Sequence, residues 1–257
     1  MNISTRNKFF IFLASAFAIH FLFIYAKSSP ADVVTPEITT PIEVPVTANA
    51  NGSDNASQKQ RSLYDSLRLS EFGLSKEAFD YAVKGYKYLL ASGRLNNEQF
   101  LSVVDFSQPS SKKRLYVIDM KKTRVLFNTY VSHGRNSGKE MASEFSNQPE
   151  SFKSSLGFFV TGGTYTGKHG FSMRLLGEEK GINDNANSRA IVMHSAAYVS
   201  ESAIRMQGFI GRSLGCPALP ENMYKPIIEK IKNGSCLFLY SPSKSYASNS
   251  TILKKLA

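Results

Sequence analysis

Two side chains in the second half of the chain, the Cys216 thiol and the His194 imidazole, have the chemistry needed for nucleophilic catalysis. A free cysteine with a pKa of about 8.5 is mostly protonated at neutral pH. A nearby imidazole can accept that proton and create the reactive thiolate. His194 ends a β-rich run, and a loop that contains several glycines leads from it to Cys216. The pair therefore predicts a cysteine enzyme of acyl transfer, with Cys216 as nucleophile and His194 as base.

The residues beside Cys216 favour this chemistry. Gly215 permits a sharp backbone turn that directs successive N–H groups into one pocket, where they can stabilise an oxyanion. Pro217 has no N–H and restricts the backbone after the cysteine. The backbone around the thiol is therefore expected to be shaped for catalysis.

Each member of the pair also has a structural alternative. Cys216 and Cys236 are the only two cysteines in the chain, and exported proteins often join their cysteines in disulfides. Cys236, however, opens an apolar run in which a buried free thiol is ordinary. His194 could be a core histidine at the end of a strand. We favour catalysis for both residues, and the number of free thiols separates the interpretations.

The expected elements around the pair are short strands. Gly and Asn punctuate a series of β-rich runs, which cover residues 114–120, 124–132, 156–161, 172–176, 190–194 and 236–240. Runs of short strands with few helices predict a mainly-β domain, which we place at residues 106–241.

Helices are expected before and after these strands. Residues 59–105 are predicted to form a helical lead-in, with Ser75 capping its main helix and a third helix near Asn96 or Asn97. One C-terminal helix is predicted over 223–232, where Asn233-Gly234 ends it. Residues 242–257 are expected to form a polar tail, from which Ile252, Leu253 and Leu256 could dock on the domain.

The N-terminal region has the pattern of an export signal. Within residues 1–28, Arg6 and Lys8 precede an apolar run that ends at Lys27. This pattern predicts a signal peptide or an uncleaved signal anchor in the inner membrane. Residues 29–58 are rich in Pro, Ser and Asn and show no periodicity, which predicts an extended linker.

The charge of the chain narrows the choice of partners. The formal net charge of +11 favours acidic surroundings such as an anionic polymer or a membrane surface. Because the N-terminal pattern predicts export of the rest of the chain, we expect a periplasmic or cell-envelope protein and no nucleic-acid partner.

Two short motifs surround the catalytic pair. His-x-Ala-x-Tyr-Val occurs over 194–199, and Gly-Arg-Ser-x-Gly-Cys-Pro-Ala occurs over 211–218. Together they resemble the murein L,D-transpeptidase catalytic domain, a branch of the YkuD-like L,D-transpeptidases. The resemblance extends from about Leu74 to Tyr240. The family's usual histidine two positions before the cysteine is Leu214 here, which leaves the acceptor and any second proton relay open.

The resemblance implies a β-sandwich fold and an enzyme that acts on peptidoglycan stem peptides. Cys216 would attack the third residue of a tetrapeptide stem, and an amine on another stem would resolve the acyl-enzyme as a 3–3 cross-link. His194 would be the base, with its ring oriented by the Ser195 carbonyl. The N–H groups of Gly215 and Cys216 would form the oxyanion hole.

Two other functions are compatible with these motifs. Water could resolve the same acyl-enzyme, which would make the protein an L,D-carboxypeptidase or endopeptidase. A non-catalytic wall-binding module could keep the fold, although the presence of both His194 and Cys216 argues against it.

Several residues near the motifs are candidates for substrate binding. Arg212 could bind a substrate carboxylate or brace its loop, and Tyr198 could line the pocket or pack beneath it. Arg174 and Arg189 could bind stem carboxylates or remain solvated. The full set of candidate substrate-binding residues is Arg212, Ser213, Tyr198, Arg174 and Arg189.

The remaining histidines do not indicate a metal site. His133 and His169 lie in Gly-containing segments and could contact substrate. The four histidines and two cysteines show no spacing typical of zinc ligands, so we expect no metal and no other cofactor. We expect a monomer.

Overall fold

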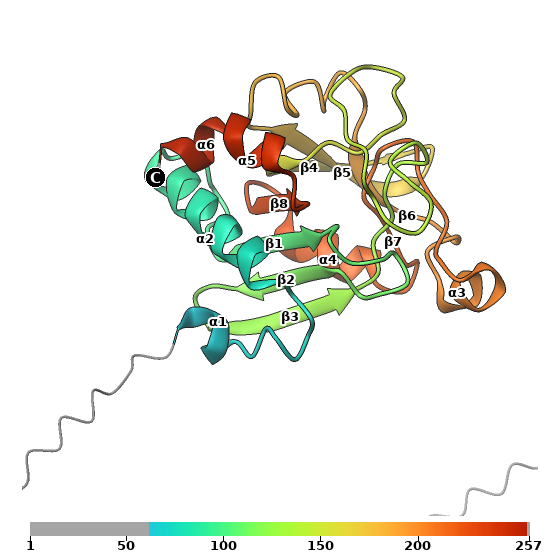
Figure 1. Cartoon of the computed structure of the whole chain (residues 1–257), viewed down its shortest axis with the longest axis horizontal. Helices are drawn as coiled ribbons and strands as arrows, with labels where there is room; N and C mark the ends of the chain where they lie inside the picture. The colour runs from blue at the N-terminus through green and yellow to red at the C-terminus, as the bar shows by residue number, and fades with distance from the viewer. Residues whose placement is uncertain (1–61, 256–257) are drawn as a thin grey trace, which may run out of the picture. The chain divides into compact units, whose positions relative to one another are not determined.

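The structure is a computed structural model that describes residues 62–255 (Figure 1). The strands in this part of the chain are β1 (Phe100–Asp105), β2 (Leu115–Asp119), β3 (Arg124–Thr129), β4 (Gly157–Gly167), β5 (Gly170–Gly177), β6 (Val192–Ser195), β7 (Ala218–Leu219) and β8 (Cys236–Tyr240). The helices are α1 (Leu63–Ser66), α2 (Lys76–Ala91), α3 (Glu201–Gln207), α4 (Tyr224–Ile231), α5 (Lys244–Asn249) and α6 (Thr251–Lys254).

All the strands join one sheet in the order β3-β2-β1-β8-β4-β5-β6-β7. Two neighbouring interior strands, β1 and β8, pair in parallel, with Val103 opposite Phe238. The pairs β1–β2, β2–β3, β4–β5, β4–β8 and β5–β6 are antiparallel, and β6 and β7 are parallel. The prediction of a mainly-β domain is therefore confirmed.

The two edges of this sheet meet in a line of hydrogen bonds that we call the seam. The segment after β3 runs beside the segment before β7, and Gly134 forms a parallel bridge with Ser213. The Ser132 N–H donates to the Ala218 carbonyl at 2.9 Å, and the Ser213 N–H donates to the His133 carbonyl at 2.9 Å. The sheet is thus curved until it nearly closes, and Cys216 lies at the closure.

The core lies along the central strands. Every residue of β1, β2 and β8 is buried, which is why these runs are nearly continuously apolar. Helix α2 covers this part of the sheet, and Figure 1 shows it beside α5 and α6. Gly85 of α2 is required by this packing, because a Cβ there would lie 2.0 Å from the ring of Phe158. Phe158 stacks in turn on Phe238, with 4.2 Å between ring centroids.

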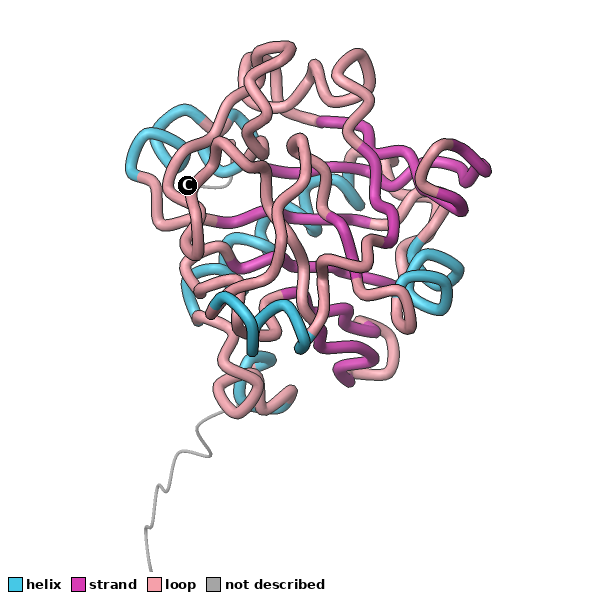
Figure 2. Tube along the Cα trace, turned by 90° about the vertical axis from the view of Figure 1, so that its right-hand side faces the viewer, coloured by secondary structure: helices cyan, strands magenta, loops and turns pink. Residues whose placement is uncertain are grey.

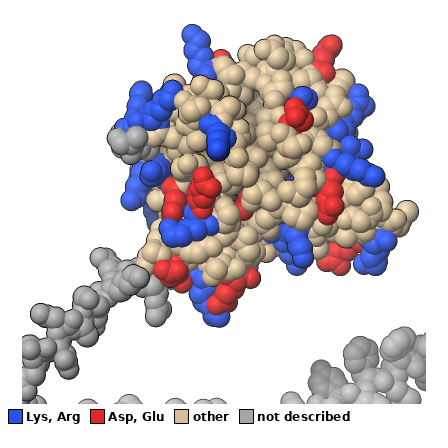
Figure 3. All heavy atoms as spheres, viewed as in Figure 1, with Lys and Arg blue, Asp and Glu red and all other residues tan. Residues whose placement is uncertain are grey.

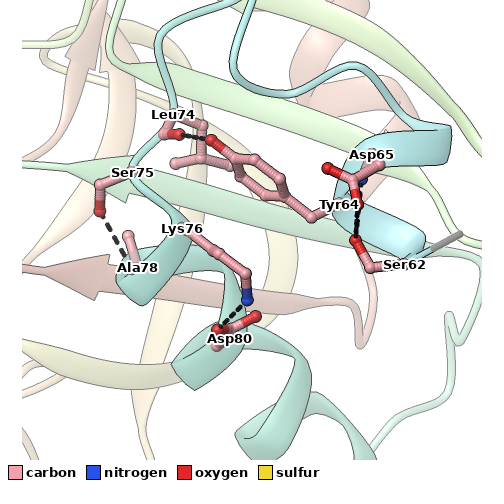
Figure 4. A network of polar contacts seen from close by, with 8 residues as sticks. All are labelled: Ser62, Tyr64, Asp65, Leu74, Ser75, Lys76, Ala78 and Asp80. Carbon is pink, nitrogen blue, oxygen red and sulfur yellow. Dashed lines mark hydrogen bonds and ion pairs between the residues drawn. The ribbon is translucent and has the colours of Figure 1, made fainter. Parts of the chain in front are cut away.

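The lead-in helices begin with side-chain caps, as Figure 4 shows. The hydroxyl of Ser75 accepts a hydrogen bond from the Ala78 N–H at 3.0 Å, so the predicted cap of α2 is confirmed. The Tyr64 hydroxyl donates to the Leu74 carbonyl at 2.6 Å and ties α1 to the start of α2.

The lead-in is not helical throughout, which corrects the prediction for residues 59–105. Residues 100–105 form β1, an interior strand, so the sheet begins before residue 106. The third helix expected near Asn96 or Asn97 does not form, because both N–H groups donate to the Gly234 carbonyl at 3.1 Å. These bonds bring β1 into register with β8.

Residues 242–255 are not the polar tail that the sequence predicted. They form α5 and α6, and Ile252 and Leu253 are buried. The hydroxyls of Tyr246 and Ser250 donate to the buried carboxylate of Glu179, which fastens both helices to the body of the domain. The single predicted C-terminal helix therefore corresponds to α4, with two more helices after it.

The predicted signal segment at 1–28 and the predicted linker at 29–58 lie outside the described residues. Within residues 62–255, none of the helices has the length and apolar character needed to span a membrane.

Candidate active site

The two cysteines are both free thiols, so the disulfide interpretation is wrong. Cys236 lies in the centre of the sheet on β8 and is fully buried. Cys216 lies on the loop before β7, at the seam, and is half-buried. Only Cys216 is therefore open to a reactant.

The Cys216 thiol lies against the segment that leads into β6. Its sulfur accepts a hydrogen bond from the Val192 N–H at 3.5 Å and donates to the Ala190 carbonyl at 3.7 Å. Ala190 has a φ of +53°, a conformation that is rare for a residue with a Cβ and that often marks a functional site. Burial raises the pKa of the Cys216 thiol, while the Val192 N–H and the nearby Arg189 guanidinium lower it. The resting group is therefore a thiol, with nearby groups that can stabilise its thiolate.

The His194 imidazole is oriented by the backbone of the next residue. Its Nδ1 lies 2.8 Å from the Ser195 carbonyl, and because a carbonyl only accepts, Nδ1 carries the proton. Nε2 is then the basic nitrogen. Burial lowers the pKa of His194, although the bond to Ser195 partly opposes this, so the neutral form is favoured at rest. The predicted orientation by Ser195 is present in this geometry.

The Cys216 thiol and the His194 imidazole both lie beside strand β6. His194 pairs with Ala218, two residues after Cys216, while the sulfur of Cys216 touches the backbone of Val192. Val192 and His194 are two residues apart, so their side chains leave the same face of β6, about 6.5 Å apart. In this conformation the thiol proton points to Ala190, so transfer to His194 requires the Cys216 side chain to turn along β6.

Gly215 shapes the loop, but its N–H is already engaged. Its φ of +121° favours glycine, and a Cβ there would lie 2.8 Å from the Lys153 carbonyl oxygen. The Gly215 N–H donates to the Ser213 hydroxyl at 3.1 Å, so in this conformation it does not face an oxyanion. The N–H of Cys216 donates to no acceptor in the described part of the chain and is the donor that remains for that role.

Three serine hydroxyls hold the cysteine loop. The Ser213 hydroxyl donates to the Cys216 carbonyl at 2.6 Å, which gives Ser213 a structural contact in place of the expected substrate contact. Ser132 also donates to that carbonyl at 3.4 Å, and Ser154 donates to the Gly215 carbonyl at 3.3 Å. Sequence reasoning missed Ser132 and Ser154, because nothing in their local sequence indicates these long-range partners.

A buried arginine–histidine pair lies behind the same loop. Arg114 is fully buried, and its Nη2 donates to Nδ1 of His133 at 2.7 Å. The His133 backbone carbonyl holds the Ser213 N–H, so the pair supports the loop from behind. Burial lowers the pKa of Arg114 to about 9, and burial together with Arg114 lowers the pKa of His133 to about 4. His133 is fully buried, so the expectation that it could contact substrate is wrong.

The three candidate arginines differ in their contacts. Arg189 donates to the carbonyls of Ser146 and Lys153 at 2.8 and 2.7 Å and to two serine hydroxyls, so its guanidinium clamps the 146–155 loop. Arg212 is exposed and donates to backbone carbonyls of the 135–138 turn at 3.1 Å. Arg174 is exposed on β5, with its guanidinium 4.7 Å from the ring centre of Tyr165. Arg212 and Arg174 therefore remain accessible cations, whereas Arg189 braces the loop.

Tyr198 packs beside the cysteine loop. Its carbonyl accepts the Gly211 N–H at 2.8 Å, and a Cβ on Gly211 would lie 2.5 Å from the Tyr198 side chain. Burial is the main cause that raises the pKa of Tyr198, and Cys216 adds to it, which places this phenol near the thiol.

His169 lies over the base. It stands at the exposed end of the β4–β5 hairpin, and its ring stacks on that of His194 with 4.4 Å between centroids and 23° between planes. The sequence indicated only that His169 could contact substrate. The contact with His194 could not be predicted, because a hairpin brings the two rings together.

The surroundings of the site show loops and mixed charge. Figure 2 looks from the side where β6 and β7 lie in Figure 1, and long loops cross this face. Figure 3 shows Lys and Arg spread among Asp and Glu on the face that it draws. Among residues 62–255, no group of three or more His, Cys, Asp or Glu side chains is placed to hold a metal ion.

Comparison with known proteins decides the family. The sequence matches the L,D-transpeptidase catalytic domain over residues 70–240. The chain belongs to this family. No curated protein matches the chain. The resemblance drawn from the two motifs is thereby confirmed, and the L,D-transpeptidase-like fold with it.

Solved structures of L,D-transpeptidases are similar to the chain at low identity. An L,D-transpeptidase from Mycobacterium smegmatis is 15% identical, with 56% of this chain and 59% of that chain covered and a TM-score of 0.35. An L,D-transpeptidase from Stackebrandtia nassauensis is 16% identical, with 56% of each chain covered and a TM-score of 0.32. The helical cell shape determining protein Pgp2 from Campylobacter jejuni is 14% identical, with 63% and 57% covered and a TM-score of 0.38. The chain thus spans less than two thirds of the length of each.

Proposed function

We propose that this L,D-transpeptidase family member forms a Cys216 acyl-enzyme from a peptidoglycan tetrapeptide stem and transfers the acyl group to an amine, giving a 3–3 cross-link. One observation carries the proposal. At the seam, a free, half-buried thiol lies beside the strand of a neutral imidazole whose Nδ1 proton is fixed by the Ser195 carbonyl. General-base activation of a thiol needs its proton within hydrogen-bond reach of the base, and a turn of the Cys216 side chain along β6 would bring it there.

The first step forms the acyl-enzyme. The Cys216 side chain turns from Ala190 toward His194, and Nε2 of His194 takes the thiol proton. The sulfur then attacks the carbonyl carbon of the third stem residue, and the Cys216 N–H donates to the developing oxyanion. The bond from that carbon to the nitrogen of the terminal D-alanine breaks, and His194 returns its proton to the leaving amine.

The second step resolves the thioester. An amine of another stem attacks the same carbonyl carbon and gives a proton to His194, the carbon–sulfur bond breaks, and the thiol is restored. Water in place of the amine would give a carboxypeptidase or endopeptidase. The exposed side chains of Arg212 and Arg174 are the cations available to hold stem carboxylates. Arg189 is engaged with loop oxygens and is assigned to support of the loop.

We also propose where the enzyme acts. A peptidoglycan substrate requires an exported, periplasmic or cell-envelope enzyme, in agreement with the predicted signal or inner-membrane anchor at residues 1–28. The net charge of +11 favours association with an anionic wall. We propose a monomer, because the two reacting groups come from one chain.

The test is incubation of the full chain with purified tetrapeptide muropeptides, read by mass spectrometry. We expect cross-linked dimers with loss of D-alanine, and an adduct on Cys216 before resolution. Tripeptides without dimers would replace the transferase assignment with the hydrolase. No change in any muropeptide would refute both.

The two cysteines supply matched variants for this test. Cys216→Ala should abolish dimers, tripeptides and adduct, whereas Cys236→Ala should retain all products while the protein stays folded. Turnover retained by the Cys216→Ala variant would show that another residue is the nucleophile.

A further inference from the structure

The β4–β5 hairpin ends in a tight turn that presents one imidazole. Gly167 pairs with Gly170, so Lys168 and His169 form the tip. Gly170 has a φ of +73°, whereas neither tip residue has a positive φ, which fits a type I turn closed by a left-handed glycine. A Cβ on Gly170 would meet nothing within 4 Å, so the glycine serves the backbone conformation alone.

The same hairpin is bonded to the strand of the catalytic base. Met173 of β5 pairs with Met193 of β6, next to His194. From this attachment the hairpin carries His169 over His194, where the rings stack at 4.4 Å and 23°. His169 itself is exposed, while only 3% of the His194 surface is accessible. One face of the base is therefore covered by a residue that faces solvent.

We propose that His169 is a positioning residue that caps the base, holding the His194 ring in line with the Ser195 carbonyl and keeping water from its face. This inference rests on the proposed function, because it takes His194 as the base. The Cys216 sulfur bonds to Val192 and Ala190, and His169 stacks on His194, so His169 acts through His194.

The electrostatics of the site agree with this role. Burial is the main cause that lowers the pKa of His194, and the neighbouring His169 acts in the same direction. The other groups around the base are the Ser195 carbonyl on β6, Cys216 on the cysteine loop and Arg174 on β5, opposite Val192. A capped imidazole stays neutral at a pH where an uncovered one would be protonated, and only the neutral form can accept the thiol proton.

The test is an NMR titration of the full chain labelled with ¹⁵N-histidine, in the wild type and in the variants His169→Phe and His169→Ala. Phenylalanine keeps a ring over His194 but cannot carry a charge, while alanine removes the cover. We expect His194 to keep its Nδ1–H tautomer and its low titration in the wild type and in His169→Phe. In His169→Ala its titration should move to higher pH and the tautomer should become mixed.

The controls separate capping from general damage. Lys168→Ala, at the other tip position, removes a charged side chain but leaves the His169 ring in place, and it should leave the His194 titration unchanged. The signal of His133, which is buried against Arg114, reports in every sample that the fold is intact. An unchanged His194 titration in His169→Ala, or equal shifts in the Ala and Phe variants, would overturn the proposal.

A kinetic measurement adds a readout that depends on the proposed function. With muropeptide substrate, His169→Ala should lower kcat/KM by about 3- to 10-fold at pH 6 and little at pH 8, and His169→Phe should stay near wild type. If no muropeptide is turned over, the proposed function fails while the NMR titration still decides the role of His169.

Discussion

Cys236 lies on β8 at the centre of the sheet, whereas Cys216 lies on the loop at the seam, where the two sheet edges meet. The centre is held by backbone ladders on both sides of each strand and by a continuous apolar core. The seam is held by a few backbone bonds together with side chains that bond to backbone atoms, among them Ser132 and Ser213. The same residue type is therefore a core side chain in one region and a candidate nucleophile in the other.

The comparison of the two cysteines shows which surroundings make a thiol reactive. Burial raises the pKa of Cys236 far above its ordinary value, with no donor to its sulfur among the contacts of the described residues. Cys216 is half-buried, and a backbone N–H and a guanidinium counteract the effect of burial on the pKa of its thiol. Polar groups placed around a thiol interrupt the apolar packing of the core. This explains why such polar support is confined to a short stretch of the sheet.

The largest expected effect is loss of chemistry at the seam without loss of fold. Cys216→Ser should lower acyl transfer by at least about 1,000-fold, because a hydroxyl is a much weaker nucleophile beside the same base. Turnover of muropeptides and thermal unfolding, measured on the same preparation, check this. A parallel fall in Tm of more than a few degrees would mean that the seam cysteine is structural.

The next effect comes from the backbone that carries the thiol. Gly215→Ala places a Cβ against the Lys153 carbonyl in a conformation with φ of +121°. We expect about 100-fold lower kcat/KM through displacement of Cys216, and stability lower by about 1–3 kcal/mol in urea unfolding. Gly163→Ala on β4 is the control, since a Cβ there would meet only Asn233 Oδ1, at an ordinary contact distance of 3.9 Å. Equal kinetics in both variants would contradict the role of Gly215.

A third effect depends on pH. The pKa of His133 is about 4 in the folded protein and near 6.5 in the unfolded chain, so between these values the unfolded chain binds more protons. This contribution to stability is fully present above pH 6.5 and is lost as the pH falls to about 4, by up to about 3 kcal/mol. Urea unfolding from pH 7 to pH 4 measures it, and His133→Asn, which keeps an acceptor for Arg114, should flatten the slope. The same slope in both proteins would assign the effect to other groups.

The smallest effect belongs to the centre. Cys236→Ser buries a hydroxyl among apolar strands, and we expect stability to fall by about 1–2 kcal/mol with kcat/KM unchanged below the unfolding transition. Thermal unfolding and muropeptide turnover check the two parts. A lower kcat/KM in this variant would show that Cys236 also contributes to catalysis.

Local patterns predicted most of the strands well. The apolar runs at 114–120 and 236–240 became β2 and β8, and the capping serine at Ser75 began α2, because these signals depend on neighbouring residues only. Strand β1 was missed because the lead-in was predicted to be helical up to residue 105, and the place of β1 is set by β8 far along the chain. Helix α3 has a serine cap at Ser200 and a glycine end at Gly208, but no buried residue to reveal it by periodicity.

The supporting groups of the site could not be predicted from local sequence. Ser132 and Ser154 reach the cysteine loop across more than 60 residues, and Arg114 supports that loop through His133. The neighbours of these three residues in sequence carry no sign of the contacts. The sequence after Ser241 did not predict α5 and α6, because it is polar and few residues of these helices are buried. The helices are held instead by hydrogen bonds to the carboxylate of Glu179. Which polar side chains become buried beside one another depends on the folded structure, so local sequence does not reveal it.

The parallel pairing of β1 with β8 has a consequence for how the chain acquires its fold. These two neighbouring interior strands come from the beginning and the end of the domain, with all other strands between them. During synthesis, β1 can pair with β8 only after residues 236–240 have been made. Contacts between such distant segments form slowly, so most of the chain stays open until translation is almost complete. That delay would favour the export that we propose, because an exported chain crosses the membrane before it folds.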